Sequence, residues 1–201
     1  MEGDHQAALD AAQRAQIIGN DAKDSRLLAS ANEHLGLAHY QLGNYQIGVE
    51  QLRAALAFVR DVPLHGRFGR ASHPWVQPRV FLAWCLAERG DFAEARAVAE
   101  EALTIAKTAG HEFSRIHAQA ALGQVHFWRG ELRDALDNLE LAFRSVESAD
   151  VPLPLVASGG RQAWLGLVYA ELDRIDDALP VLDSPRERSE AQEVRVLLCA
   201  A

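Results

Sequence analysis

Four pairs of helices are predicted by a pattern of small and apolar residues that recurs along the chain. In each unit, a leucine followed by glycine or alanine precedes a turn. In the first three units, small or apolar residues follow the turn at steps of four and then three positions, which places them on one helix face. The small residues flanking each turn are 12 positions apart: 36 and 48, 83 and 95, 123 and 135, and 166 and 178. This constant spacing predicts helix–turn–helix units whose helices approach closely.

The turn within each unit has its own signature. The first three turns read Gly43-Asn44-Tyr45, Gly90-Asp91-Phe92 and Gly130-Glu131-Leu132, and a degenerate fourth reads Asp173-Arg174-Ile175. Glycine takes the left-handed conformation that commonly ends a helix. Asp, Asn or Glu then favours the start of the next helix. The signature predicts where each helix pair changes direction.

These units predict one all-α solenoid over residues 1–201. Helix pairs are expected at about 25–60, 76–109, 113–148 and 158–182, after a half repeat at 3–18. The chain thus starts inside a repeat, which suggests a piece of a longer protein. Ser184-Pro185-Arg186-Glu187 reads as a capping box and predicts a last helix at about 185–199. The apolar end of that helix, residues 194–198, predicts an uncapped solenoid end that could drive formation of a homo-oligomer.

The units resemble the tetratricopeptide repeat, which has Leu-Gly on its first helix, a Gly-Asp-Tyr-like turn, and Ala, Leu and Ala on its second helix. The unit spacings are 47, 40 and 43 residues (36 to 83, 83 to 123 and 123 to 166), against about 34 in the standard repeat. Longer helices or loops must absorb the difference. The resemblance implies a right-handed α-α superhelix.

The segments GLAHYQLGNYQIGVEQLRAAL and FLAWCLAERGDFAEARAVAEEAL resemble a narrower group. This group is the C-terminal repeat region of large bacterial signalling proteins. In those proteins, a class III adenylate/guanylate cyclase-like domain and a STAND-type ATPase precede the repeats. The resemblance implies a regulatory role for these repeats within a longer protein.

A concave binding groove is implied by the repeat resemblance, because first helices line the concave side of such superhelices. The residues expected to line it are Leu37, Tyr40, Gln41, Val80, Trp84, Glu88, Gln124, Phe127, Trp128, Leu167 and Glu171. Aromatic side chains are common anchors of bound partners. The alternative is that Trp84, Phe127 and Trp128 pack between repeats as core residues. Both interpretations stay open at the level of sequence.

Charge and composition narrow the classes of partner. The chain has 20 Lys and Arg against 28 Asp and Glu, a net charge of −8, which argues against nucleic-acid binding. Two distant cysteines supply neither a disulfide framework nor metal-ligand spacing. Because no stretch approaches the roughly 18 apolar residues of a membrane span, we expect a cytoplasmic protein. The segment from residue 60 to 79 is locally basic, and Arg67, Arg70 and Arg79 are either solvated or contact an anion or an acidic partner.

Motifs of catalysis are not found in the sequence. There is no GxxxxGK[ST] phosphate loop and no GxSxG nucleophile elbow. His111-Glu112 begins like a zinc-protease motif, but Arg115 stands where the second histidine is needed. Cys85 lies in an apolar helix and is expected to be an inert buried thiol, and His39 and His126 are expected to be packed and hydrogen-bonded. We therefore expect no metal, no cofactor and no enzymatic activity.

A surface for partners remains as the main functional feature. The leading hypothesis is a non-catalytic protein–protein interaction scaffold, the regulatory repeat region of a larger cytoplasmic signalling protein. Its partner would be a protein or peptide, or upstream domains of the same chain. The alternative is a small-molecule or peptide sensor that regulates an upstream ATPase or cyclase. A sensor predicts a pocket of about 300–1,000 Å³ with convergent polar groups.

Overall fold

The computed structural model describes residues 5–60, 63, 72–148 and 161–182, which form helices joined by short turns. No strand occurs among these residues. The helices are α1 (His5–Ala22), α2 (Ser25–Gln41), α3 (Tyr45–Phe58), α4 (Gln77–Glu88), α5 (Phe92–Thr108), α6 (Glu112–Trp128), α7 (Leu132–Ser148), α9 (Arg161–Glu171) and α10 (Ile175–Leu182).

The all-α solenoid predicted from the repeat pattern is confirmed. The pairs are α2 with α3, α4 with α5, α6 with α7, and α9 with α10. Helix α1 fills the place of the preceding half repeat, but it continues to Ala22 rather than ending near residue 18. The helix expected at 185–199 lies outside the described residues. Within the described part of the chain, no helix has the length and apolar character to cross a membrane.

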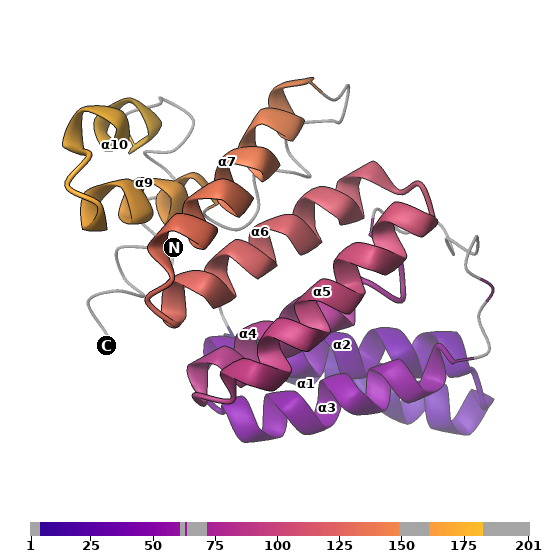
Figure 1. Cartoon of the computed structure of the whole chain (residues 1–201). Coiled ribbons are helices and arrows are strands. Elements are labelled where there is room, and N and C mark those ends of the chain that lie inside the picture. Colours follow the sequence, from indigo (N-terminus) through magenta and orange to yellow (C-terminus); the bar gives the residue numbers. More distant parts are fainter. Residues whose placement is uncertain (1–4, 61–62, 64–71, 149–160, 183–201) are drawn as a thin grey trace.

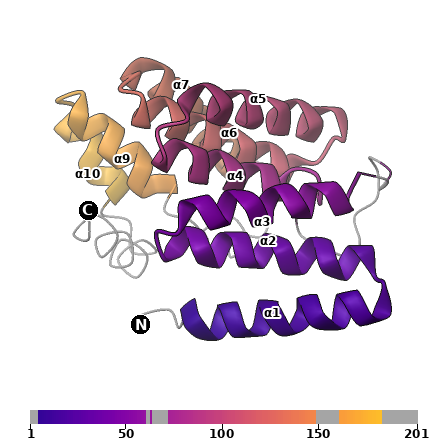
Figure 2. The same cartoon turned by 90° about the horizontal axis from the view of Figure 1, so that it is seen from below.

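The pairs stack so that first helices contact first helices. Helix α2 contacts α4, α4 contacts α6, and α6 contacts α9. We call α2, α4, α6 and α9 the inner layer. Helices α1 to α3 lie at one end of the stack, and α9 and α10 lie at the other (Figures 1 and 2). A helix pair alone leaves one face open, so each pair depends on its neighbours for burial.

The small residues of the repeat are the points where paired helices touch. At Gly123 of α6, an added Cβ would lie 2.7 Å from Leu139 Cγ of α7, and at Gly166 of α9 it would lie 2.6 Å from Leu182 Cγ of α10. Real Cβ atoms are essentially never this close to another atom. The Leu-Gly step of the sequence is therefore required by the close approach of one helix to a leucine of the next.

The turns take the left-handed backbone that their glycines predict. Gly43, Gly90 and Gly130 have φ angles of 75°, 83° and 76°. The degenerate fourth turn has the same conformation without glycine, because Asp173 has a φ of 58°. A side chain in this region is strained by contact between Cβ and the following carbonyl.

Replacing Asp173 with glycine should therefore stabilise the protein. We expect a gain of about 0.5–1 kcal/mol, because the strain of the left-handed aspartate is relieved while the flexible unfolded chain offsets part of the benefit. Urea denaturation of the two proteins measures the difference. An unchanged or lower midpoint for Asp173→Gly would show that the fourth turn gains nothing from glycine.

The core consists mainly of two clusters along the stack. The larger one surrounds α4, where Val80, Cys85 and Leu86 are fully buried. The second joins α6, α7 and α9 through Ile116 and Leu165, among others. Because the clusters fill the space between the layers, the side chains left for function lie on the outer faces of the stack and along the inner layer.

Candidate functional site

An aromatic cluster joins α2, α3 and α4 and includes two residues of the predicted groove, Tyr40 and Trp84. The ring centroids of Tyr40 and Trp84 are 5.7 Å apart, those of Tyr40 and Tyr45 are 5.8 Å apart, and those of Phe81 and Trp84 are 5.3 Å apart. Tyr40, Tyr45 and Trp84 are partly buried. We call these four residues the first aromatic cluster.

Glu88, the last residue of α4, belongs to this cluster through its closeness to Tyr40. The Tyr40 hydroxyl and the Glu88 carboxylate each affect the pKa of the other. Burial raises the pKa of Glu88 above its usual range, although the Tyr40 hydroxyl acts in the opposite direction. Burial, and next the Glu88 charge, raise the pKa of Tyr40. The carboxylate thus sits in an environment poorer in water than that of a surface glutamate.

A second aromatic cluster lies further along the inner layer, on α6 and α9. The ring centroids of Phe127, Trp128 and Trp164 are separated by 5.3 to 5.6 Å, in edge-to-face arrangements. Phe127 and Trp164 pack on the core of the C-terminal half. Trp128 is 36% exposed. These residues therefore combine packing between repeats with a surface that a partner can reach.

The residues predicted for the groove divide into three groups. Trp128, Gln41 and Glu171 are exposed. Leu37, Tyr40, Trp84, Glu88, Phe127 and Leu167 are partly buried. For Val80 and Gln124 the prediction of a place in the groove is wrong. Their side chains are 0% and 3% exposed and lie in the core instead of on a surface. Val80 packs in the larger core cluster around α4 and is thereby shielded from solvent.

A pocket of about 390 Å³ lies between α1 and α2 at the N-terminal end of the stack. Its walls include Leu37 and Gln41, two residues of the predicted groove. The rest of its lining is mostly alanine and leucine, with Ser30 and His34 as further polar groups. The volume is in the range of small-molecule sites, but the lining offers few polar groups to orient a ligand.

The basic segment contributes two described arginines, Arg60 and Arg79, and the charge of Arg79 is already paired. Arg79 lies in α4, where Nη1 donates to the Trp75 carbonyl at 2.8 Å and Nη2 donates to Glu101 Oε1 at 2.8 Å. Only 11% of its side chain is exposed. Arg79 is therefore an internal link between α4 and α5, which corrects its assignment to an anion-binding loop. Arg67 and Arg70 lie outside the described residues.

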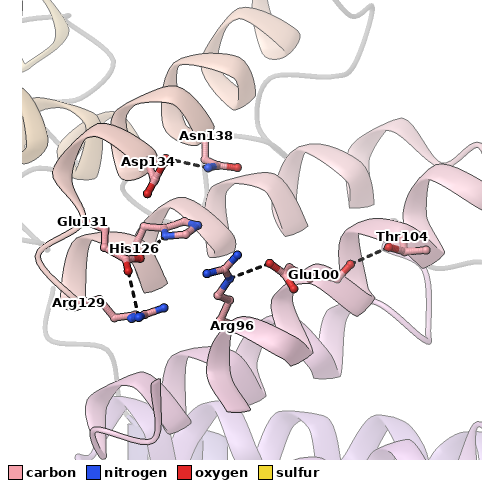
Figure 3. Close-up of polar contacts among 8 residues, drawn as sticks. All are labelled: Arg96, Glu100, Thr104, His126, Arg129, Glu131, Asp134 and Asn138. Carbon is pink, nitrogen blue, oxygen red and sulfur yellow. Dashed lines mark hydrogen bonds and ion pairs between the residues drawn. The ribbon is translucent and has the colours of Figure 1, made fainter. Parts of the chain in front are cut away.

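A polar cluster fixes the turn between α6 and α7 (Figure 3). His126 Nδ1 and Glu131 Oε2 are 2.6 Å apart, and Arg129 Nη2 lies 3.0 Å from Glu131 Oε1. His126 is packed and hydrogen-bonded, as its core-facing position predicts. For His39 the prediction of a hydrogen bond is wrong, because its Nδ1 is buried with no hydrogen-bond partner among the described residues. The hydrogen bond from His126, with help from Arg129, lowers the pKa of Glu131.

The same cluster brings together side chains that can ligate a cation. Ligand atoms of His126, Glu131 and Asp134 all lie within 4.8 Å of one another. However, both oxygens of Glu131 already have partners in His126 and Arg129. Arg96 of α5 adds a further positive charge near Glu131. The charged side chains of the cluster pair with one another. We infer that the cluster stabilises the turn.

Replacing Glu131 with glutamine should lower the melting temperature at pH 7 by about 2–4 °C, the effect of weakening one hydrogen bond to a charged group. The lowered pKa means that this contribution is present above the unfolded-state pKa near 4.5 and is lost as pH falls below it. Melting curves from pH 7 to 3 should therefore converge in acid. Asp137→Asn, which removes an exposed charge from α7, is the control. A difference that persists at pH 3 would contradict this account.

Cys85 lies in the core of α4 and is fully buried. Burial raises the pKa of its thiol to about 12. Only the thiolate is nucleophilic, so the geometry agrees with the prediction of an inert thiol. Among the described residues, this leaves the two aromatic clusters and the α1–α2 pocket as the candidate sites.

Sequence similarity identifies the repeat class. Residues 76–101 and 160–184 match the family model of the tetratricopeptide repeat. These two segments are therefore similar to tetratricopeptide repeats, in agreement with the Leu-Gly and turn motifs. A search of curated proteins finds no sequence that matches the chain.

Solved structures with the same fold include a Rap protein complexed with Competence and Sporulation Factor (TM-score 0.76, 16% identity, 94% of this chain and 50% of that chain). A Rap conjugation gene regulator of the plasmid pLS20, in complex with the Phr* peptide, has a TM-score of 0.69 at 16% identity, over 94% of this chain and 50% of that one. The chain thus spans half the length of these two Rap proteins. A putative kinesin light chain from Podosopora anserina with TPR-like repeats has a TM-score of 0.57 at 18% identity, over 97% and 99% of the two chains.

Several residues of the candidate site were missed by sequence reasoning. Tyr45 and Phe81 complete the first aromatic cluster, and Trp164 completes the second. Tyr45 follows the first Gly-Asn turn, where its aromatic ring was interpreted only as part of the turn motif. Trp164 precedes the Leu165-Gly166 step directly, so its place beside the α6 aromatics follows from the stacking of α6 on α9.

Proposed function

We propose that the chain is a non-catalytic scaffold that binds a peptide segment of another protein along its inner layer. The observation that carries the proposal is the run of aromatic side chains on neighbouring inner helices, from Tyr40 and Trp84 to Trp128 and Trp164. These rings are incompletely buried although they belong to packed repeats. Aromatic residues with one face exposed to solvent are typical anchors of protein interfaces.

The fold supports this proposal through its structural relatives. Two Rap proteins that share the fold were solved in complex with Competence and Sporulation Factor and with the Phr* peptide. At 16% identity, this likeness concerns the fold. It supports peptide binding as a use of such a solenoid and names no partner for this chain.

A regulatory role in a larger cytoplasmic signalling protein is the finer part of the proposal. It rests on the resemblance to repeat regions that follow a cyclase-like domain and a STAND-type ATPase. In that setting, the inner layer would bind upstream domains or a signalling peptide and so alter the ATPase. Self-association through the solenoid ends is a further proposal, which the exposed Ile17 and Ile18 of α1 favour.

A small-molecule sensor is the second candidate, because the α1–α2 pocket has a suitable volume of about 390 Å³. The substitution Ala11→Trp would fill this pocket from α1. A sensor would lose its ligand in this variant, whereas a scaffold that uses the aromatic clusters would keep its peptide.

The proposal is tested by selecting peptides from a random display library on the wild-type protein. Selected peptides should bind the wild type and lose at least about tenfold in affinity to the variant Trp84→Ala/Trp128→Ala, because anchor residues carry most of the binding energy. The matched control is Phe58→Ala/Leu141→Ala, which removes exposed apolar side chains from the second helices α3 and α7. Equal binding to both variants, or no selection above background, would refute the proposal.

A further inference from the structure

Glu88 differs in its partners from several other glutamates of the stack. Glu94 pairs with Arg53 at 2.6 Å, Glu101 with Arg79 at 2.8 Å, and Glu131 with Arg129 at 3.0 Å. Among the described residues, no basic side chain forms an ion pair with Glu88. The adjacent Arg89 is directed to Asp91 at 3.1 Å instead. Glu88 therefore lies near the Tyr40 hydroxyl and has no ion-pair partner among the described residues.

The surroundings of Glu88 are suited to a cation. The carboxylate lies among the rings of Tyr40, Tyr45 and Trp84, and their electron-rich faces attract cations within about 6 Å. A carboxylate that is partly withdrawn from water gains more from a paired cation than an exposed one does. The indole Nε1 of Trp84 is also buried without an acceptor among the described residues. The Glu88 carboxylate thus lacks a countercharge, and the Trp84 indole N–H lacks a hydrogen-bond acceptor, among the described residues.

The fourth repeat shows what the complete arrangement looks like in the same chain. There, the Tyr169 hydroxyl donates to Glu140 Oε1 at 2.8 Å, and the Arg174 guanidinium lies 4.6 Å from the centre of the Tyr169 ring. Tyr40 and Glu88 repeat the tyrosine–glutamate pair, but no arginine stacks on Tyr40 among the described residues. The comparison shows that a guanidinium group can stack on a tyrosine that is hydrogen-bonded to a glutamate in this chain.

We propose that Glu88 and the first aromatic cluster form a subsite for a basic side chain, arginine above all, of the bound peptide. This inference rests on the proposed function and adds the chemistry of the partner. The charge of the cation pairs with Glu88, and its flat face lies against Tyr40, Tyr45 or Trp84. Apolar neighbours in the peptide then reach the partly exposed rings of the inner layer. A net charge of −8 on the chain favours the approach of such a segment.

The test uses the full chain and two capped tripeptides, Leu-Arg-Leu and Leu-citrulline-Leu. Citrulline keeps the shape of arginine but has no charge. Binding is measured by nuclear magnetic resonance from the Trp84 indole N–H signal, which is identified by its loss in Trp84→Phe. We expect a saturable shift with the arginine peptide and about tenfold weaker binding of the citrulline peptide.

Two variants separate charge from shape. Glu88→Gln should weaken the arginine peptide about tenfold and leave the citrulline peptide unchanged. Glu50→Gln, which removes an equal charge from an exposed site on α3, should bind both peptides as the wild type does. Thermal unfolding followed by circular dichroism checks that each variant is folded. Equal binding of the two tripeptides, no shift with either, or equal loss of both in Glu88→Gln would overturn the inference.

The outcome also separates this inference from the proposed function. One outcome is that library peptides bind the inner layer, carry no basic residue and bind Glu88→Gln with unchanged affinity. In that case the scaffold function is supported and the cation subsite is wrong. If no peptide binds the inner layer at all, the proposed function and the inference both fail.

Discussion

Replacing Leu52 with alanine should lower the free energy of unfolding by about 2–5 kcal/mol. Leu52 of α3 is fully buried, and it lies directly against Gly36 of α2. The substitution removes apolar contacts and leaves a cavity that tight helix packing prevents from closing. Urea denaturation followed by circular dichroism measures the change. Phe58→Ala on the same helix removes a side chain that is 37% exposed and should have a much smaller effect.

A further prediction concerns substitutions of Gly36 and Leu52 together. A Cβ at position 36 would lie 2.8 Å from Leu52 Cδ2 and 3.1 Å from Cδ1, so Gly36→Ala alone should destabilise by about 1–3 kcal/mol through overpacking. In the double variant, the added methyl group occupies the space that Leu52 leaves. The loss should therefore be smaller than the sum of the single losses by about 1 kcal/mol or more. Strictly additive losses would contradict a direct contact between the glycine and the leucine.

Replacing Trp84 with alanine should have the largest effect on binding. Trp84 lies on α4 in the middle of the inner layer, with Tyr40 on one side and Phe81 on the other. Central, well-packed tryptophans are typical hot spots, and their loss removes about 2 kcal/mol or more, which corresponds to about a thirtyfold loss in affinity. Titration calorimetry with a peptide selected on the wild type measures the change.

Because Trp84 also packs against the core, its loss could act through folding. Trp128→Ala provides the second readout, since this side chain is 36% exposed and contributes less to the core. It should reduce affinity about tenfold while leaving the melting temperature within a few degrees. Loss of stability without loss of affinity in both variants would place the two tryptophans in the core alone.

The helix pairs could be predicted from sequence because the contact between helices demands small residues at fixed spacing. Gly123 faces Leu139, and Gly166 faces Leu182, so the Leu-Gly motif records the packing itself. The turn glycines likewise record a left-handed backbone. The fourth turn was harder to recognise in the sequence because Asp173 adopts this conformation in place of glycine.

The candidate site was less predictable because periodicity gives the face of a helix but not its burial. Val80 and Trp84 are four residues apart on α4, yet Val80 is in the core and Trp84 is partly exposed. The partner of Arg79 is Glu101, 22 residues away on another helix, and no local pattern reveals it. Partners of Glu88 and His126 depend in the same way on how the pairs stack.

The most direct test of the inner layer as the binding face is photo-crosslinking. A peptide selected on the wild type is synthesised with benzoyl-phenylalanine at each apolar position in turn, and crosslinked residues are located by mass spectrometry. The account predicts crosslinks on α2, α4, α6 and α9, centred on Tyr40, Trp84 and Trp128. Crosslinks confined to the second helices α3, α5 and α7 would contradict it.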